Sequence, residues 1–520
     1  MKILPNPQKF VNISGSFTVD ANSKVYTDGS FDKQVARFVQ LVAHSCGFTL
    51  QYTSVIEEAQ FIFNSGEQCA NEGYTIMISR GMATVTAATE TGCYYAVESL
   101  FQLFNLHVKQ DGITCANCYV EDAPKFAYRG LLVDICRHFF DVNTLKQIVE
   151  LMSQVKLNTL HLHLSDDQGF RLQIDKYPLL NEVGSVRAGS QVVKNGKSYV
   201  DEVPYGGYLT KDDVRELVAY AAEHNVQVIP EIDVPGHFVA ALAAYPEYSC
   251  TGAVAEVRKT WGISKDILCA GNDASYAFIC DILDEVCDLF PSPYVHLGGD
   301  EVPKDRWCNC RLCRERMSEL KFDDYEQLQD YMVEQFRLHL ESKGKTVICW
   351  NDGVTSGTSN EIVSQIWQPF KHRSAARKTK NGRKVIISPY FYNYFGLPYA
   401  LTPISKTLTL NPYKGVLPKN RANVLGVEGT MWTEYIDSVD KLFFYLLPRL
   451  DALAECAWGH KRRGFNKRLA HKRLSRYQSM GLNYNAKATK TKFFGRLTTI
   501  KNFFKKDSDV EMPKAKQSDK

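Results

Sequence analysis

A pair of adjacent carboxylates follows an apolar run in the middle of the chain, in the segment His296-Leu297-Gly298-Gly299-Asp300-Glu301. The run indicates a buried strand, and its two glycines allow another group to approach closely. Neighbouring carboxylates repel and desolvate each other, so one should stay ionised while the pKa of the other is raised. General acid catalysis needs this arrangement. An isolated Asp-Glu pair after a strand is more often a helix N-cap with a first-turn acid, so its surroundings must decide.

Other segments end an apolar run in the same way, with polar residues that are able to take part in catalysis. They are residues 129–138, 161–168, 230–237, 349–352 and 432–434. One such segment would carry little information. Together with the acid pair, these segments indicate a pocket that is assembled at strand ends.

The elements that must position these residues alternate regularly from Tyr128 onward. Strands are predicted at 129–134, 158–163, 226–232, 294–299, 346–350, 362–367, 384–388 and 424–428. Helices are predicted between several of them, at 142–156, 211–224, 274–290 and 323–343. This alternation predicts an α/β fold, a (β/α)8 TIM barrel rather than an open sheet. The polar motifs lie at the C-terminal strand ends, which is the face where this fold places active sites.

A small α+β domain is predicted before the barrel, over residues 1–122. Residues 74–78 and 83–87 alternate like paired strands around a turn at Arg80-Gly81, and a helix is predicted over 92–106. The catalytic barrel is expected to span 123–460 and to close with a helix around 441–457.

Residues 461–520 form a basic segment, predicted as a tail that is partly helical and then disordered. It holds 18 Lys/Arg against 4 Asp/Glu, a net charge of +14, which leaves −10 for the rest of a chain whose total is +4. Residues 487–506 could form a basic amphipathic helix with weak contact to an anionic membrane. The alternative is that this segment packs on its own protein.

Composition excludes several classes of protein. The chain has 520 residues, of which 44% are hydrophobic, so it can bury a large core. Its mildly acidic body gives no indication of a nucleic-acid groove. The sequence shows no signal peptide, no transmembrane run and no nucleotide-binding motif in the right context. Fifteen scattered cysteines suit reduced thiols, so we expect a cytoplasmic protein.

Two groups of cysteines raise the question of a metal. Cys308, Cys310 and Cys313 lie just after the acid pair, and Cys115 and Cys118 form a second CxxC. A structural zinc site needs four ligands, and no adjacent His or Cys completes the first group. The sequence therefore predicts no metal site.

Taken together, these segments resemble the family 20 glycoside hydrolases of bacterial type, the β-N-acetylhexosaminidases. The resemblance covers about residues 73 to 458 and rests on His296–Glu301, His163–Gln168 and Glu231–His237. It implies an exo-acting enzyme that removes terminal non-reducing β-linked GlcNAc or GalNAc from glycans with retention. It further implies no cofactor and substrate-assisted catalysis through an oxazolinium ion.

The resemblance also implies the catalytic roles. Glu301 would be the general acid and later the base that activates water. Asp300 would orient the 2-acetamido group and stabilise positive charge on its nitrogen. Tyr394 would donate to the acetamido oxygen, while Asp166 and His237 would support the catalytic glutamate through hydrogen bonds.

Sugar-binding residues follow from the same resemblance. Arg137 would grip the 3- and 4-hydroxyls, since its guanidinium fork suits neighbouring hydroxyls, with Glu434 on the far wall. Trp350, Trp367 and Trp432 would pack against the sugar ring as aromatic walls, although a core position is the usual one for a single tryptophan.

The sequence departs from the family at Gly396, where an Asp that contacts a sugar hydroxyl is usual, and Tyr392 competes with Tyr394 for the tyrosine role. One alternative function is a non-hydrolytic sugar-binding protein on the same barrel, against which the intact acid pair with Asp166 and His237 argues. Another is a narrower relative, such as a lacto-N-biosidase or a 6-sulfo-GlcNAc-specific enzyme.

Overall fold

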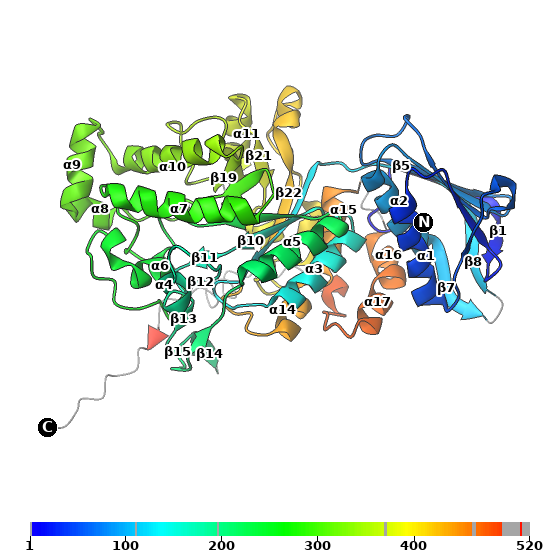
Figure 1. Ribbon diagram of the computed structural model, residues 1–520, viewed down its shortest axis with the longest axis horizontal. Coiled ribbons are helices and arrows are strands. Elements are labelled where there is room, and N and C mark those ends of the chain that lie inside the picture. The colour runs from blue at the N-terminus through cyan, green and yellow to red at the C-terminus, as the bar shows by residue number, and fades with distance from the viewer. Residues whose placement is uncertain are drawn as a thin grey trace.

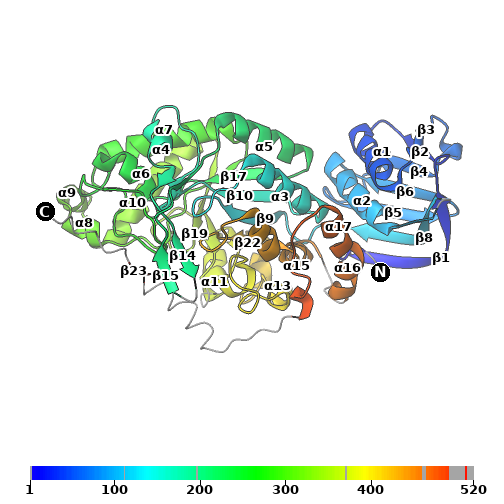
Figure 2. The ribbon, with the colours of Figure 1, turned by 90° about the horizontal axis from the view of Figure 1, so that it is seen from below.

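The computed structural model describes residues 3–109, 112–194, 197–368, 372–459, 464–490 and 510–511. A small N-terminal domain lies beside a larger barrel along the long axis of the molecule (Figure 1). Helices from the C-terminal part of the chain lie between them, as the view from below also shows (Figure 2).

Eight parallel strands close into a barrel in the order β10-β17-β18-β19-β20-β21-β22-β9. Their bounds are β9 Tyr128–Asp134, β10 Thr159–His163, β17 Gln227–Glu231, β18 Tyr294–His296, β19 Thr346–Trp350, β20 Val363–Ile366, β21 Val385–Ile387 and β22 Val424–Met431. Each matches one of the eight predicted strands, so the predicted TIM barrel is confirmed. The strands read as apolar runs because both of their faces are buried, one in the barrel interior and one under the helices.

Helices cover the outside of the barrel. They are α3 Val142–Gln154, α5 Lys211–Glu223, α7 Asp273–Leu289, α10 Tyr325–Ser342, α11 His372–Lys380, α13 Ile404–Thr409, α14 Val439–Leu446 and α15 Arg449–Ala457. Asp141, Thr210 and Asp324 cap α3, α5 and α10 by accepting a backbone N–H, which fixes where these helices begin. The single helix expected around 441–457 is divided into α14 and α15, because Pro448 has no N–H to continue it.

Short elements fill the loops that follow the strands. They are β11 Ser165–Asp166, β12 Gly169–Phe170, α4 Leu179–Glu182, β13 Val186–Arg187, β14 Gln191–Lys194, β15 Lys197–Val200, β16 Tyr205–Gly206, α6 Val239–Ala244, η2 Pro246–Tyr248, α8 Asp305–Asn309, α9 Arg311–Glu319 and α12 Tyr390–Asn393. In addition, η3 Pro418–Asn423 precedes β22, and β23 Val510–Glu511 pairs with β15. The long loops after β10, β17 and β18 build the rim of the C-terminal face.

The small domain is a mixed sheet in the order β1-β8-β5-β6-β4-β2-β3, with β7 beside β8. Two helices, α1 Asp32–Cys46 and α2 Glu90–Leu103, pack on one face of it (Figure 2). The strands are β1 Lys9–Val19, β2 Lys24–Thr27, β3 Gln51–Tyr52, β4 Phe61–Ser65, β5 Tyr74–Ser79, β6 Met82–Ala87, β7 Phe104–Lys109 and β8 Gly112–Asp122, and η1 Ile56–Glu58 precedes β4. The predicted hairpin is present as β5 and β6, and both turn residues, Arg80 and Gly81, have positive φ. The helix predicted at 92–106 is α2, which begins two residues earlier, at Glu90. It ends at Leu103 because the next residues belong to β7.

Buried charges fix the small domain to the N-terminal face of the barrel. Asp122 accepts from Lys156 Nζ at 3.0 Å and from Trp458 Nε1 at 2.9 Å. Arg129, which is fully buried, pairs with Glu72 at 2.7 Å. Arg129 is therefore a structural residue, and the C-terminal face of the barrel is left open to ligands.

The chain after residue 460 contributes to the folded body. The elements α16 Phe465–Lys472, α17 Leu474–Ser479 and η4 Ala488–Lys490 follow it, and Phe465, Leu469 and Tyr477 are buried. Arg473 Nε donates to Asp451 Oδ1 at 2.8 Å, so part of the basic charge is neutralised internally. The sequence predicted a tail here because basic residues dominate the composition, and the few apolar residues among them gave no clear signal of packing.

The possible membrane-contacting segment, 487–506, lies mostly outside the described residues, since the structure does not describe 491–509. Its contact with a membrane stays a prediction. Within the described part of the chain, no helix is both long and apolar enough to cross a bilayer.

Candidate active site

The loop after β18 carries the acid pair and is built on glycine. Gly298 and Gly299 have φ of 63° and 87°, a conformation that disfavours other residues. A Cβ on Gly298 would lie 1.8 Å from Asp233 Oδ1. The Gly299 N–H donates to the same oxygen at 3.0 Å. The two glycines predicted that another group approaches closely, and that group is the side chain of Asp233, which follows β17.

Glu301 and His237 face each other, with His237 Nε2 lying 3.5 Å from Glu301 Oε2. Both have φ near 50°, in the left-handed region, which costs about 1–3 kcal/mol for such residues. Side chains of consecutive residues in an extended strand would point to opposite faces. Here the backbone is turned, and Asp300 and Glu301 line one cavity.

A chain of alternating charges continues from His237 into the barrel. His237 Nδ1 lies 3.4 Å from Asp166 Oδ1, and Asp166 Oδ2 lies 2.8 Å from His163 Nε2. His163 Nδ1 is in turn 2.5 Å from Glu231 Oε2. Burial opposes protonation of His237, but Asp166 outweighs it and the pKa of His237 is raised well above its usual value. For His163, Glu231 and Asp166 outweigh burial and raise the pKa to about 10.

Asp300 is the member of the pair with a raised pKa. Burial is the main cause, and the carboxylate of Asp233 adds to it. Its Oδ1 is buried and has no hydrogen-bond partner among the described residues. An N–H donor placed against this oxygen would favour the ionised carboxylate and lower the pKa. The site is therefore suited to a ligand that brings an amide N–H.

A cavity of about 270 Å³ opens in front of these groups. All of the predicted site residues except Asp166 line it, namely Arg137, His237, Asp300, Glu301, Trp350, Trp367, Tyr394, Trp432 and Glu434. Asp166 lies behind His237. Tyr392 is not among the lining residues, and its ring lies 5.3 Å from Lys406 Nζ, so Tyr394 is the one of these two tyrosines that lines the cavity.

The three tryptophans are held in place by hydrogen bonds or ring contacts. Trp350 is 1% exposed, and its Nε1 donates to Glu231 Oε1 at 2.8 Å. Trp367 Nε1 donates to Asp352 Oδ1 at 2.9 Å, and the Trp367 ring stacks on Tyr394 with centroids 6.3 Å apart. Trp432 lies 5.0 Å from the Arg137 guanidinium carbon. Rigid indole walls suit the apolar faces of a sugar ring.

Arg137 is oriented by three neighbours before any ligand arrives. It bonds Asp166 at 2.6 Å, Gln168 at 3.1 Å and Asp134 at 3.2 Å. Glu434 lines the same cavity, and burial raises the pKa of Glu434 although Arg137 opposes the shift. A fixed cation and a carboxyl thus share the cavity and can bind adjacent hydroxyls.

Several functional residues lie in segments that the sequence singled out without giving them a role. Asp352 accepts the Glu301 N–H at 3.2 Å and so positions the acid loop. The row of alternating charges behind His237 includes His163 and Glu231. Asp233 supports the glycine turn by accepting the Gly299 N–H. Trp261, in the loop before α7, lines the cavity with no sequence signal beyond its residue type.

Gly396, the departure from the family pattern, lies against the backbone of Trp432. A Cβ there would lie 2.2 Å from the Trp432 carbonyl oxygen, so an Asp cannot be accommodated without movement. We expect Gly396→Ala to lower the free energy of unfolding by about 1–3 kcal/mol, because a methyl group is forced into packed backbone. Urea denaturation measures this change, and an unchanged midpoint would contradict the packing.

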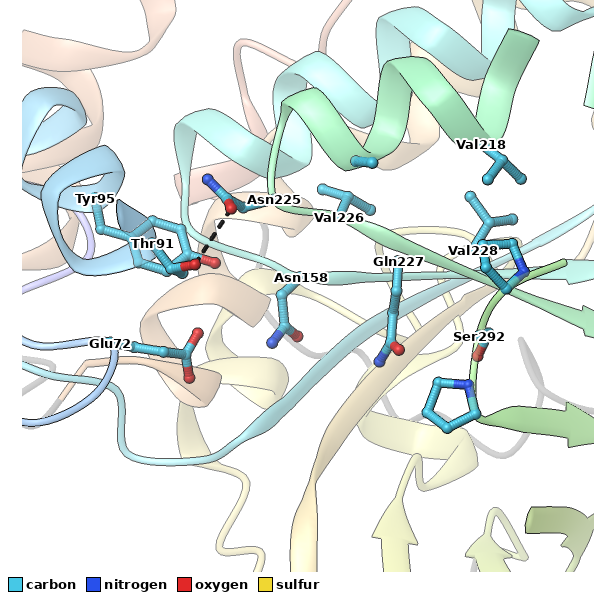
Figure 3. Close-up of a pocket in the computed structure, with 13 residues that line it drawn as sticks. Glu72, Thr91, Tyr95, Asn158, Val218, Asn225, Val226, Gln227, Val228 and Ser292 are labelled. Atoms are coloured by element: carbon cyan, nitrogen blue, oxygen red, sulfur yellow. Dashed lines mark hydrogen bonds between the residues drawn. The ribbon is translucent and has the colours of Figure 1, made fainter. Parts of the chain in front are cut away.

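A larger cavity, of about 460 Å³, lies at the other end of the barrel (Figure 3). Glu72 and Tyr95 of the small domain and Asn158, Gln227 and Ser292 near the strand starts line it. Glu72 is the one carboxyl among its described lining residues, and Arg129 already pairs with it. This cavity offers no acid pair, so the smaller cavity is the candidate active site.

Comparison with known proteins agrees with this geometry. Residues 126–461 match the family model described as glycosyl hydrolase family 20, catalytic domain, and residues 1–123 match its domain 2. A β-hexosaminidase of Porphyromonas gingivalis is 32% identical over 481 residues, covering 88% of this chain but 60% of that protein. One from Akkermansia muciniphila is 33% identical over 401 residues, covering 74% of this chain and 79% of that protein.

A solved structure shares the arrangement of both domains. The exo-β-N-acetylglucosaminidase of Vibrio harveyi in complex with N-acetylglucosamine superposes with a TM-score of 0.82 at 27% identity, covering 93% of this chain and 78% of that one. The two family models together cover most of the described chain. The chain therefore belongs to glycosyl hydrolase family 20, the family of the β-hexosaminidases.

Proposed function

We propose that the protein is an exo-β-N-acetylhexosaminidase that removes terminal β-linked GlcNAc or GalNAc with net retention. The observation that supports this most directly is the Asp300 carboxylate, whose buried oxygen Oδ1 has no partner among the described residues and which lines the same cavity as Glu301 and Tyr394. A carboxylate beside the acid, rather than across the cavity from it, suits a substrate that supplies its own nucleophile.

In the first step the acetamido oxygen of the substrate attacks the anomeric carbon. The bond to the leaving oxygen breaks, and Glu301 delivers a proton to that oxygen. Asp300 accepts the acetamido N–H and stabilises the positive charge that develops on the nitrogen, while the Tyr394 hydroxyl donates to the attacking oxygen. Because these groups are fixed before the substrate binds, they stabilise the transition state without reorganisation.

In the second step Glu301 takes a proton from water, which attacks the anomeric carbon and opens the oxazolinium ring. Two displacements at one carbon leave its configuration unchanged. Glu301 must therefore release and regain a proton in each turnover. His237, held protonated by Asp166, lies at the right distance to share that proton.

The substrate class is supported by relatives and by the size of the cavity. The matched proteins are named β-hexosaminidases, and the Vibrio harveyi structure contains N-acetylglucosamine. The cavity, about 270 Å³, is below the roughly 300–1,000 Å³ of pockets for drug-sized ligands and suits one sugar unit. Arg137 and Glu434 on its wall suit recognition of a terminal residue through its hydroxyls.

A panel of chromogenic β-glycosides tests this proposal. We expect hydrolysis of the GlcNAc or GalNAc glycoside and no comparable hydrolysis of the glucoside, which lacks the acetamido group. A 6-sulfo-GlcNAc glycoside tests the narrower specificity. Equal rates on glucose and GlcNAc would refute the participation of the acetamido group, and binding without hydrolysis would leave a sugar-binding protein.

The pH dependence of Asp166→Asn tests the charge chain. His237 lies 3.5 Å from Glu301, and the negative charge of Asp166 keeps His237 protonated as the pH rises. Without this charge, burial favours neutral His237, so His237 loses its proton at lower pH. We expect the alkaline limb of kcat/KM to move to lower pH and kcat to fall roughly 10–100-fold.

Asp175→Asn is the control, because Asp175 is an exposed carboxylate that does not line the cavity. Its profile should coincide with that of the wild type. If Asp166→Asn lowers the rate equally at every pH, Asp166 acts only through structure, and its charge does not set the protonation of His237.

A further inference from the structure

Four cysteine side chains meet beside the loops that form the active site. The Sγ atoms of Cys250, Cys269, Cys310 and Cys313 all lie within 4.8 Å of one another. The distances are 3.8 Å from Cys250 to Cys313, 3.8 Å from Cys269 to Cys310 and 3.7 Å from Cys269 to Cys313. Cys308, which the sequence grouped with Cys310 and Cys313, is exposed and is not one of the four. Cys250 and Cys269 thus come from an earlier loop, and the spacing of cysteines in the sequence did not reveal them as partners of Cys310 and Cys313.

The backbone brings the two halves of the cluster together. Ser249 and Leu268 form an antiparallel bridge, and the Cys269 N–H donates to the Tyr248 carbonyl at 2.9 Å, so Cys250 and Cys269 lie in two paired segments. Cys310 immediately precedes α9, and Cys313 lies in its first turn. A Cβ on Gly271 would lie 2.1 Å from the carbonyl carbon of Leu312, so only glycine allows this loop to rest on the start of α9.

The sulfur distances fit a tetrahedron of thiolates around one ion. With a Zn–S bond of about 2.3 Å, the edge of a regular tetrahedron is about 3.8 Å. A disulfide would need an S–S distance of about 2.05 Å instead. We propose that Cys250, Cys269, Cys310 and Cys313 bind one Zn²⁺ ion.

The surroundings suit a negatively charged, closed metal site. Cys269 and Cys313 are almost fully buried, Cys310 is 8% exposed and Cys250 is partly exposed, so an ion can enter from one side. The N-terminus of α9 stabilises thiolates, and this helix also carries arginines at 311, 314 and 316. Four protein ligands leave no open position for a substrate, so the zinc is structural.

The zinc would join two loops that shape the active site. Cys250 and Cys269 belong to the loop after β17, which also carries His237 and Trp261, whereas Cys310 and Cys313 follow Glu301 in the loop after β18. The Leu268 N–H donates to the Pro235 carbonyl at 3.0 Å, and Trp307 Nε1 donates to the Leu268 carbonyl at 2.9 Å. The metal therefore fixes the strand-end segment before His237 relative to the segment after Glu301.

Metal analysis of the intact chain tests the site independently of hydrolysis. We expect protein purified without chelators to contain about one zinc per chain by elemental analysis, and native mass spectrometry to show one bound ion. Replacement by Co²⁺ should give the visible absorption bands of a tetrahedral thiolate complex. Removal of the zinc should lower the Tm, and added Zn²⁺ should restore it.

Cys269→Ser and Cys308→Ser form the matched pair of variants. Cys269→Ser should lose the zinc and the cobalt bands, whereas Cys308→Ser, a cysteine of the same segment outside the cluster, should keep both. Wild-type protein that stays below about a tenth of an equivalent in the presence of added zinc would overturn the proposal, even if the variants fail to fold. A non-reducing mass that shows disulfides among the four cysteines would overturn it as well.

Discussion

Replacing Glu301 by glutamine is expected to lower kcat by roughly 10²–10⁴-fold, the usual contribution of a general acid and base. Glutamine has the shape of the acid form but has no proton to deliver at the leaving oxygen. Its neighbours are fixed independently: Asp352 holds the Glu301 backbone N–H, and Asp233 holds the glycine turn before it. Binding of the sugar should therefore stay within a few-fold of the wild type.

Substrates with different leaving groups make this result specific. A phenol that departs without protonation needs no acid, so its release in the first step should suffer least in Glu301→Gln. An alkyl or sugar leaving group should suffer most. Glu361→Gln, at an exposed position, serves as the control and should behave like the wild type. If Glu301→Gln loses activity equally on all leaving groups, its defect lies in structure rather than in proton transfer.

Much of the fold could be predicted from the sequence because the barrel strands are buried on both faces. A run such as Gly130-Leu131-Leu132-Val133 has few alternatives inside a large protein, and β9 is buried throughout. Each run is followed at once by polar residues, so the strand ends also predicted where the site lies. The helices predicted at 142–156 and 211–224 begin where α3 and α5 begin, since Asp141 and Thr210 cap them.

Contacts between distant segments could not be predicted in the same way. Nothing near Cys310 in the sequence indicates Cys250 or Cys269. A bridge between Ser249 and Leu268 pairs the segments of these two cysteines, and the contact of Gly271 with Leu312 brings them to Cys310. Likewise, Phe465 and Tyr477 stand among many basic residues, and their burial depends on a surface formed by other helices. The role of Gly396 was open because only the structure shows Trp432 behind it.

The row of alternating charges from His237 through Asp166 and His163 to Glu231 supports the acid pair from behind. Asp166 contacts both His237 and Arg137, at 3.4 Å and 2.6 Å, so one carboxylate holds both the histidine beside Glu301 and the arginine that is expected to bind hydroxyls. Arg137, together with the neighbouring histidines, outweighs the cost of burial and keeps the pKa of Asp166 well below its usual value. In the proposed mechanism, this single buried group would couple proton transfer to sugar recognition.

Asp300→Asn should lower kcat by roughly 10²–10³-fold on a GlcNAc substrate, because a neutral amide cannot stabilise the cation that forms on the acetamido nitrogen. A thiazoline analogue of the oxazolinium ion separates this role from that of Glu301. When protonated, its ring nitrogen carries the charge that Asp300 is placed to meet, so Asp300→Asn should bind it at least tenfold more weakly. Glu301→Gln should still bind it tightly.

This comparison works because the two acids are neighbours in one cavity, so general damage to the pocket would weaken thiazoline binding in both variants. Free GlcNAc carries no such charge, and its affinity should change little in Asp300→Asn. Inhibition constants for the thiazoline and for GlcNAc, measured on both variants, therefore distinguish lost charge stabilisation from lost shape. If Asp300→Asn retains full affinity for the thiazoline, the buried carboxylate does not face the developing cation, and catalysis assisted by the substrate is excluded for this site.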